Sequence, residues 1–450
     1  MMTKFTPQNA RELAFTSLER VRKTKAYSNL QVDETLRRHD LSPADRRLVT
    51  TIVYGTLQHQ LTLEYWLKSL TSGKRLDPWV ETLLLTALYQ YNYLDRVPDW
   101  AITDETIKIA KHRGNPGIRK FVTGVLHSAL RKGVPDLASI KPVAKRLSIE
   151  ASVPQWLVEK FIEENGEQTT EKILQAINEP AHVSIRVNTK KSNLETVKQQ
   201  LLDEGIETAE SQVAANALVV TSGNVVNSPL LKDGIITIQD ESAMLAVESM
   251  DLHPQFKVLD ACAAPGGKTV QIAEQLSSAQ GGQVVALDIH QHKVRLIERN
   301  AQRMGVGSVV KPLALDARKV NDKFTDEEFD RILVDAPCSG IGLLRRKPEI
   351  RYTKTAHDSQ QLHQIQLAIL NAVAPKVKKG GIIIFSTCTI LTEENEHTVQ
   401  EFLQAHPDFT LERTVTKRAL KDDRDSATLT ILPSDYGSDG FFISCLKRNL

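Results

Sequence analysis

The sequence predicts a multi-domain protein, with an all-α bundle at residues 1–140, a small α+β unit at 141–235 and an α/β domain at 236–450. Three observations lead to this prediction. Apolar residues of the first segment recur every three or four positions, as on one face of a helix. The middle segment mixes helical with alternating patterns. In the last segment, short apolar runs alternate with helical stretches, which is typical of a doubly wound parallel sheet.

Composition narrows the class of protein. Hydrophobic residues make up 41% and charged residues 25% of the 450 residues, which excludes a wholly disordered or fibrous chain. No apolar run approaches the roughly 18 residues that cross a bilayer, so we expect no membrane span. Residues 1–7 lack the apolar core of a signal peptide, so we expect a cytoplasmic protein. Four cysteines are too few for a disulfide framework, which leaves packing, metal-binding or nucleophilic roles.

Signals for helix starts recur through the first segment. Residues 9–18 place their apolar side chains three and four positions apart. Ser42 before Pro43 predicts an N-cap and a first helical turn, and Pro78 opens a further helix. We expect five to seven helices packed as a bundle, which the turn at 133–135 ends.

The first 140 residues are also basic. They hold 21 Lys and Arg against 14 Asp and Glu, whereas the remainder holds 36 against 41. A basic front part is typical of proteins that bind a polyanion, but an ordinary solvated helical surface has the same charge. Charge alone leaves both interpretations open.

The middle and last segments supply the predicted strands. The middle segment has helices after Pro154 and near 194–202, with alternating runs at 183–188, 217–220 and 235–238. The last segment has apolar runs that we expect to be strands of one parallel sheet, at 258–260, 284–287, 313–315, 332–334 and 382–385. Ligands of such sheets bind at the carboxyl ends of the strands, so the residues after each run are site candidates.

The first of these runs continues into a loop of small residues, Asp260–Thr269, that leads to a helix. Its glycines let the backbone approach a ligand, and the helix start offers free N–H groups. The dinucleotide fingerprint is absent, and the phosphate loop matches only at 267–269, with Cys262 in place of its first glycine. The third candidate is S-adenosylmethionine (SAM), a sulfonium cation without phosphate. The expected cofactor-binding residues here are Cys262, Ala263, Ala264, Pro265, Gly266, Gly267 and Lys268.

Acidic residues follow three further strands, as a SAM site requires. Asp288 lies about 20 residues past the loop, where a carboxylate can accept hydrogen bonds from both ribose hydroxyls. We expect Asp316 to meet the adenine edge and Asp335 to line the same pocket. The alternative is that any one of these aspartates only caps a helix.

Two cysteines also follow strands. Cys338 lies in Asp335–Gly340, after the fourth run, and Cys388 lies after the fifth. A lone cysteine is more often a small buried hydrophobe, but two at one sheet edge favour chemistry. Zinc is a weaker interpretation, because no Cys-x-x-Cys pair or His cluster accompanies them, and we expect no metal site. Cys445, in the late apolar run 441–445, is expected in the core.

The motifs around these residues resemble those of SAM-dependent RNA cytosine-5 methyltransferases, the NOL1/NOP2/Sun family, over about residues 145–450. The bundle, with residues 48–55, is similar to the RNA-binding fold of the antitermination factor NusB. The departures are small: Glu241 and Met244 stand where alanine and glutamine are expected, and Thr389 where serine is commoner. The segments that carry the resemblance are 186–189, 239–243, 260–269, 335–340, 344–350, 387–389 and 439–442.

The resemblance implies fold, partners and residue roles. It implies a NusB-like bundle, an RRM-like α+β unit and a Rossmann-like SAM-dependent domain. It also implies 16S ribosomal RNA as partner, and a monomer is the default state. In DNA cytosine-5 methyltransferases the cysteine of a Pro-Cys motif attacks, which would be Cys338. The RNA family implies instead Cys388 as the nucleophile, with Cys338 assisting proton removal and product release. Asp335 would bind N3 or the exocyclic amine of a flipped cytosine.

Several alternatives remain open at this point. The same catalytic domain could act on tRNA or DNA, or the chain could be a non-catalytic RNA-binding assembly factor. A thiol-dependent hydrolase would need a histidine beside its cysteine, and the spacing indicates none. The basic run 345–347 is either a phosphate contact, which we expect, or a solvated loop.

Overall fold

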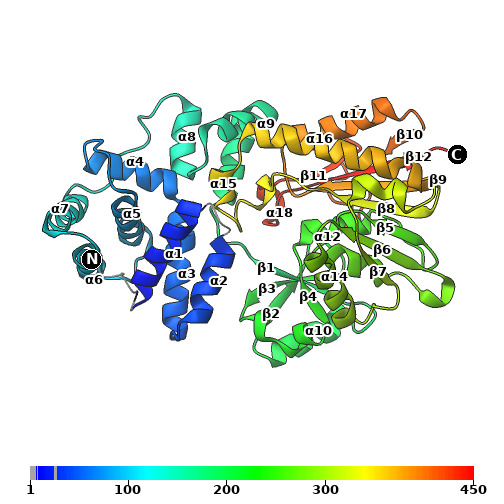
Figure 1. Cartoon of the computed structure of the whole chain (residues 1–450), viewed down its shortest axis with the longest axis horizontal. Coiled ribbons are helices and arrows are strands. Elements are labelled where there is room, and N and C mark those ends of the chain that lie inside the picture. Colours follow the sequence, from blue (N-terminus) through cyan, green and yellow to red (C-terminus); the bar gives the residue numbers. More distant parts are fainter. Residues whose placement is uncertain (1–6, 8, 25–27) are drawn as a thin grey trace. The chain divides into compact units, whose positions relative to one another are not determined.

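The computed structural model describes residues 7, 9–24 and 28–450 (Figure 1). Residues 1–6, on which most of the signal-peptide argument rests, lie outside the described residues. The chain divides into two compact units. The first extends to Asn178 and takes in Arg346–Thr353, and the second consists of Glu179–Arg345 and Lys354–Leu450. Among the described helices, none combines the length and apolar character needed to cross a bilayer.

The first unit is helical, as the spacing of apolar residues predicts. Ser42 caps its third helix, because its side chain accepts a hydrogen bond from the backbone N–H of Asp45 at 3.1 Å. Pro43 and Pro78 stand at the first position of their helices. The helices are α1 Ala10–Thr24, α2 Ser28–Arg38, α3 Pro43–Gln58, α4 Gln60–Leu70, α5 Pro78–Tyr93, α6 Asp99–Arg113, α7 Pro116–Lys132, α8 Val143–Ala151, α9 Gln155–Ala176 and the short α15 Ile350–Thr353.

A four-stranded antiparallel sheet begins the second unit, with strand order β2-β3-β1-β4. A helix follows the first strand and a second helix precedes the last, which is the RRM-like arrangement that the sequence predicts. One strand, β2, was not predicted, because its four residues are largely exposed and two of them are glutamates. The elements are β1 Val183–Val187, α10 Leu194–Asp203, β2 Glu207–Glu210, β3 Ala217–Ser222, α11 Pro229–Lys232 and β4 Ile236–Ile238.

The larger sheet of this unit has the order β10-β12-β9-β8-β5-β6-β7, and β11 pairs with β12. The five strands predicted as parallel are parallel to one another. The sheet is nevertheless mixed, because β12 runs antiparallel to β9 and β10. The strands are β5 Lys257–Asp260, β6 Gln283–Asp288, β7 Val310–Ala314, β8 Phe329–Asp335, β9 Val377–Thr387, β10 Phe409–Glu412, β11 Leu429–Ile431 and β12 Phe441–Arg448.

Helices cover both faces of the larger sheet (Figure 1). Successive strand residues alternate between two apolar cores: Val258 packs into one core and Leu259 into the other. The first core contains residues of α12, α13 and α14, and the second contains residues of α16 and α17. Burial on both faces explains why these strands read as continuous apolar runs. The helices are α12 Glu241–Glu248, α13 Gly267–Ala273, α14 Gln291–Met304, α16 Ala356–Val373, α17 Glu396–Ala405 and α18 Pro433–Tyr436.

Candidate active site

The predicted site residues gather at the carboxyl edge of the five parallel strands. Asp288 and Asp335 are the last residues of β6 and β8, and Asp316 follows β7 by two positions. Cys388 comes directly after β9, and Cys338 lies three residues past β8. Because parallel strands all point the same way, side chains from distant parts of the sequence meet at this edge.

The loop after β5 is held close to the sheet. Its backbone hydrogen-bonds to β6 from Ala263 N to Leu287 O at 2.8 Å, and Asn300 of α14 donates to Pro265 O at 2.8 Å. Gly266 has φ +105°, and a Cβ there would lie 3.1 Å from Ile297 Cα, so glycine fits this turn best. The turn begins α13, whose first N–H groups face the end of the loop. Burial raises the pKa of the Cys262 thiol well above its usual value, so this cysteine stays protonated.

Asp260, the last residue of β5, is a buried carboxyl that the sequence analysis assigned no role. Its Oδ2 accepts a hydrogen bond from Thr269 Oγ1 at 2.7 Å, whereas Oδ1 has no hydrogen-bond partner among the described residues. Burial raises the pKa of Asp260 to about 7, and the charge of Asp335 adds to the rise. Only its place at a strand end, as the first residue of the loop motif, could have indicated it.

Asp288 and Asp316 both cap the turns that follow them. Asp288 Oδ1 accepts from His290 N at 2.8 Å, and its other oxygen lies 3.8 Å from Lys293 Nζ. Asp316 accepts from the guanidinium of Arg318 with both oxygens, at 2.6 to 3.1 Å. These hydrogen bonds lower the pKa of Asp316. The capping alternative is therefore present in the structure, and the roles of both aspartates toward a cofactor stay predictions.

Asp335 and Lys268 form a pair beside the cysteines. Lys268 Nζ lies 2.9 Å from Asp335 Oδ2, and Ser386 Oγ donates to Asp335 Oδ1 at 2.9 Å. The ammonium also lies 5.0 Å from the ring centroid of Phe441. Burial acts to lower the pKa of Lys268, but the carboxylate of Asp335 and the sulfur of Cys388 outweigh it, so the pKa is raised. A fixed positive charge thus stands near Cys388.

The two cysteines are in contact although 50 residues separate them. Cys338 Sγ lies 3.0 Å from Cys388 Sγ, and both cysteines are free and half-buried. The hydrogen bond to Cys388, together with burial and the charge of Glu394, raises the pKa of Cys338 well above its usual value. The structure therefore brings together the two thiols that the sequence selects.

The other candidates have structural positions. Cys445 lies in the core on β12, where burial raises its pKa to about 12. Arg345 donates to the carbonyl oxygens of Pro433, at 2.8 Å, and Gly437, so it binds the backbone around α18. Within the described part of the chain, no group of three or more His, Cys, Asp or Glu side chains could hold a metal ion.

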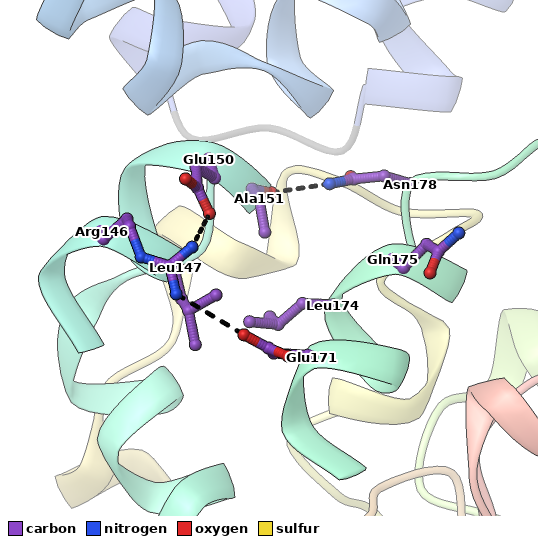
Figure 2. Close-up of a pocket in the computed structure, with 8 residues that line it drawn as sticks. All are labelled: Arg146, Leu147, Glu150, Ala151, Glu171, Leu174, Gln175 and Asn178. Atoms are coloured by element: carbon purple, nitrogen blue, oxygen red, sulfur yellow. Dashed lines mark hydrogen bonds and ion pairs between the residues drawn. The ribbon is translucent and has the colours of Figure 1, made fainter. Parts of the chain in front are cut away.

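A separate cavity of about 280 Å³ opens in the helical unit between α8 and α9 (Figure 2). Arg146 projects into it and pairs with Glu150 at 2.9 Å and with Glu171 at 3.5 Å (Figure 2). The charges that line this cavity are thus already paired, and none of the predicted site residues contributes to it.

Comparison with known proteins identifies similar chains. Family models match in the order NusB family at residues 8–131, Methyltr_RsmF/B-like ferredoxin-like domain at 153–227 and 16S rRNA methyltransferase RsmB/F at 247–447. The probable ribosomal RNA small subunit methyltransferase B of Bacillus subtilis (strain 168) is 41% identical over 444 residues, covering 98% of this chain and 99% of that protein. The protein of the same name from Synechocystis sp. is 34% identical over 452 residues, again covering 98% and 99%.

Among solved structures, that of PH0851 is similar over 99% of this chain and 100% of its own, with 28% identity and a TM-score of 0.80. The predicted fold class and the predicted family resemblance are confirmed by these matches.

Proposed function

This chain belongs to the family of ribosomal RNA small subunit methyltransferases B, and on that premise we propose that it transfers a methyl group from SAM to C5 of a cytosine in 16S ribosomal RNA. In this proposal the reaction passes through a covalent bond between Cys388 and C6 of the base. One observation carries the proposal: the Sγ atoms of Cys338 and Cys388 lie 3.0 Å apart at the ligand edge of the sheet.

The residues around the loop after β5 suit SAM. The loop at 262–268 offers backbone rather than a phosphate cradle, and Asp288 and Asp316 offer carboxylates rather than cations. Asp260, the first residue of this loop motif, adds a buried carboxyl oxygen without a partner among the described residues. When bound, SAM supplies an electrophilic methyl group on a sulfonium centre.

A thiolate is needed because C5 of cytosine is a poor nucleophile. The Cys388 thiolate adds to C6, forming the S–C6 bond and moving the electron pair of the C5–C6 double bond toward C5. C5 then takes the methyl group as the bond between that methyl group and the sulfonium sulfur breaks, leaving a neutral thioether. Removal of the C5 proton and breaking of the S–C6 bond restore the aromatic ring and free the thiolate. The ammonium of Lys268 stands near enough to Cys388 to stabilise a negative charge on sulfur.

The raised pKa of Cys338 supports the roles that the family implies. Cys338 holds its proton, because its hydrogen bond to Cys388, its burial and Glu394 all raise its pKa. A protonated Cys338 is a poor nucleophile, which leaves the attack to Cys388. To assist release, Cys338 first gives up its own proton; as a thiolate it then accepts the C5 proton while the S–C6 bond breaks and Cys388 leaves as the thiolate. In this proposal Asp335, whose carboxylate is bound by Lys268 and Ser386, bonds N3 or the exocyclic amine of the cytosine.

The proposal is tested by transfer of labelled methyl groups from SAM to unmethylated 16S RNA, followed by nucleoside analysis. We expect the label in 5-methylcytosine, and none in tRNA or DNA offered at the same concentration. Label in another nucleoside would contradict the chemistry, and transfer to tRNA alone would contradict the substrate.

A further inference from the structure

Two adjacent buried side chains, Glu394 and Asn395, contact the two cysteine loops, which are the segments 337–339 around Cys338 and 387–389 around Cys388. They stand where the short 3-10 turn Thr392–Glu394 meets α17. Their exposed fractions are 0% and 1%, so neither side chain competes with water for its partners. The sequence analysis assigned them no role, because no nucleophile or ligand pattern includes them.

Glu394 holds the loop that carries Cys338. Its Oε2 accepts from Ser339 N at 2.8 Å, directly after the cysteine. Gln366 donates to the same oxygen at 3.3 Å and to Pro337 O at 3.0 Å, directly before the cysteine. Ser359 Oγ donates to the other carboxylate oxygen at 2.9 Å. The backbone on each side of Cys338 is therefore fixed to one buried carboxylate and its amide neighbour.

Asn395 holds the loop that carries Cys388. Its Oδ1 accepts from Thr387 Oγ1 at 2.5 Å, and its Nδ2 donates to Thr389 O at 3.0 Å. These two threonines flank Cys388 in the sequence. A direct hydrogen bond from Ser339 Oγ to Thr389 Oγ1 at 3.0 Å also joins the two loops.

We propose that Glu394 and Asn395 are positioning residues that set the separation of the two thiols, because their side chains hydrogen-bond to the residues that flank each cysteine. The proposal rests on the function proposed above. Two loops 50 residues apart in the sequence are thus bound by side chains of two adjacent residues, in addition to the direct hydrogen bond between the loops. A misplacement of about 1 Å at a reacting atom can cost on the order of 100-fold in rate. Loss of these hydrogen bonds is therefore expected to slow methyl transfer.

The test compares the full-length wild type with Asn395→Ala and with Glu394→Asp, which keeps the charge near Cys338 but shortens the side chain that bonds to Ser339 N, in two measurements. The first is methyl transfer, for which we expect kcat to fall at least about tenfold while KM for SAM and RNA changes less than about twofold. The second needs neither substrate: diamide oxidises the two thiols to an intramolecular disulfide, with reduction of diamide to its hydrazine and loss of 2 Da (two hydrogen atoms) from the protein. We expect this oxidation to slow at least about tenfold in both variants, because the two sulfur atoms are no longer held in contact with each other.

The matched control is Asn188→Ala. Asn188 is an equally buried amide that donates to Gly234 O at 3.0 Å and Met304 O at 2.8 Å, and it contacts neither cysteine loop. It should lose stability but oxidise at the wild-type rate. If Asn395→Ala does not fold, Asn395→Asp replaces it, since it keeps the acceptor oxygen and removes only the donor to Thr389.

The two readouts separate the proposals. If the variants at positions 394 and 395 both oxidise at the wild-type rate, the positioning role is overturned, whatever their methyl-transfer activity. Slow oxidation in the variants of an enzyme whose wild type makes no 5-methylcytosine would support positioning and reject the proposed function.

Discussion

At the scale of single residues, the two thiols differ although they touch. Cys338 is held protonated by its hydrogen bond, its burial and Glu394, whereas Cys388 has the ammonium of Lys268 nearby. These surroundings agree with the proposed roles of Cys388 as the nucleophile and Cys338 as its assistant, which the spacing of the two motifs in the sequence could not separate.

Substituting each thiol should therefore have a different result. Cys388→Ala should abolish methyl transfer and adduct formation, because no sulfur remains to attack C6. Cys338→Ala should accumulate a protein–RNA adduct that survives denaturing electrophoresis, because release requires removal of the C5 proton and its acceptor is missing. An adduct that appears in the Cys388 variant and not in the Cys338 variant would reverse the two roles.

Asp260 should make stability depend on pH. The folded protein keeps this carboxyl protonated up to about pH 7, whereas the unfolded chain loses the proton near its ordinary value of 3.8. Between these values the folded state binds more protons, so the free energy of unfolding falls as pH rises, by at most a few kcal/mol at ~1.4 kcal/mol per unit.

Urea denaturation of wild type and Asp260→Asn between pH 4 and pH 8 measures this effect. The variant should show a flatter dependence on pH. Equal slopes for the two proteins would mean that Asp260 titrates as in a peptide.

Much of the site could be predicted from residues alone, and the reason is geometric. Parallel strands end at one edge, so Asp288, Asp335 and Cys388 had to lie there. Two features could not be predicted: the Asp260 oxygen without a partner among the described residues, and the hydrogen bonds of Glu394 and Asn395 to the cysteine loops. Each depends on which side chains pack against the ends of the strands. The bond from Arg345 to a carbonyl oxygen near α18 could not be predicted either, because its partner lies 88 residues away in the sequence; the expected phosphate contact of the run 345–347 stays a prediction.

At the scale of elements, the C-terminal strand β12 supports the active site through a close backbone contact. Gly342, in the short turn Ile341–Leu343, donates to Cys388 O at 3.0 Å and accepts from Gly440 N at 2.9 Å. A Cβ at Gly342 would lie 2.0 Å from Gly440 O and 2.9 Å from Cys388 O. The glycine just before β12 thus packs on the turn that follows the Cys338 loop.

Gly342→Ala should force these backbones apart. We expect a loss of about 1–3 kcal/mol in unfolding free energy and a fall in kcat, measured by denaturation and by methyl transfer. Gly307→Ala is the control, because its Cβ would approach only Gln302 Cγ, at 3.8 Å. Equal effects of both substitutions would argue against a specific contact at Gly342.

Elements were predicted where their apolar runs are long enough to show a period. The strands β2, β10 and β11 were not predicted, because they have three or four residues and partly polar faces. β12 was predicted as a strand, but a run buried on both faces reads the same in either direction, so its antiparallel pairing could not be foreseen.

At the scale of the whole molecule, the two units are not consecutive in the sequence. The chain leaves the second unit after Arg345, contributes Arg346–Thr353 to the helical unit and returns at Lys354. Arg351 is fully buried there and donates to Gln58 O and Ala151 O at 2.9 Å, to Ile177 O at 3.1 Å and to Asn178 Oδ1 at 2.8 Å. One guanidinium therefore joins the ends of α3, α8 and α9.

Arg351→Met should be strongly destabilising, because several buried acceptors lose their donor at once. We expect a loss of about 3 kcal/mol or more in the free energy of unfolding of the helical unit. Arg38→Met is the control: its exposed pair with Glu34 should contribute less than about 0.5 kcal/mol. Similar denaturation midpoints for the two variants would contradict the role given to Arg351.

The inserted segment also bears on how this chain is made. A nascent polypeptide that has emerged only as far as Asn178 contains the residues of α1–α9 but not Arg351. The carbonyl groups at the ends of three helices therefore lack the guanidinium that donates to them in the folded protein. The N-terminal unit can be completed only after some 170 further residues have left the ribosome. Complete folding of the N-terminal helical unit thus depends on translation of the chain through Thr353.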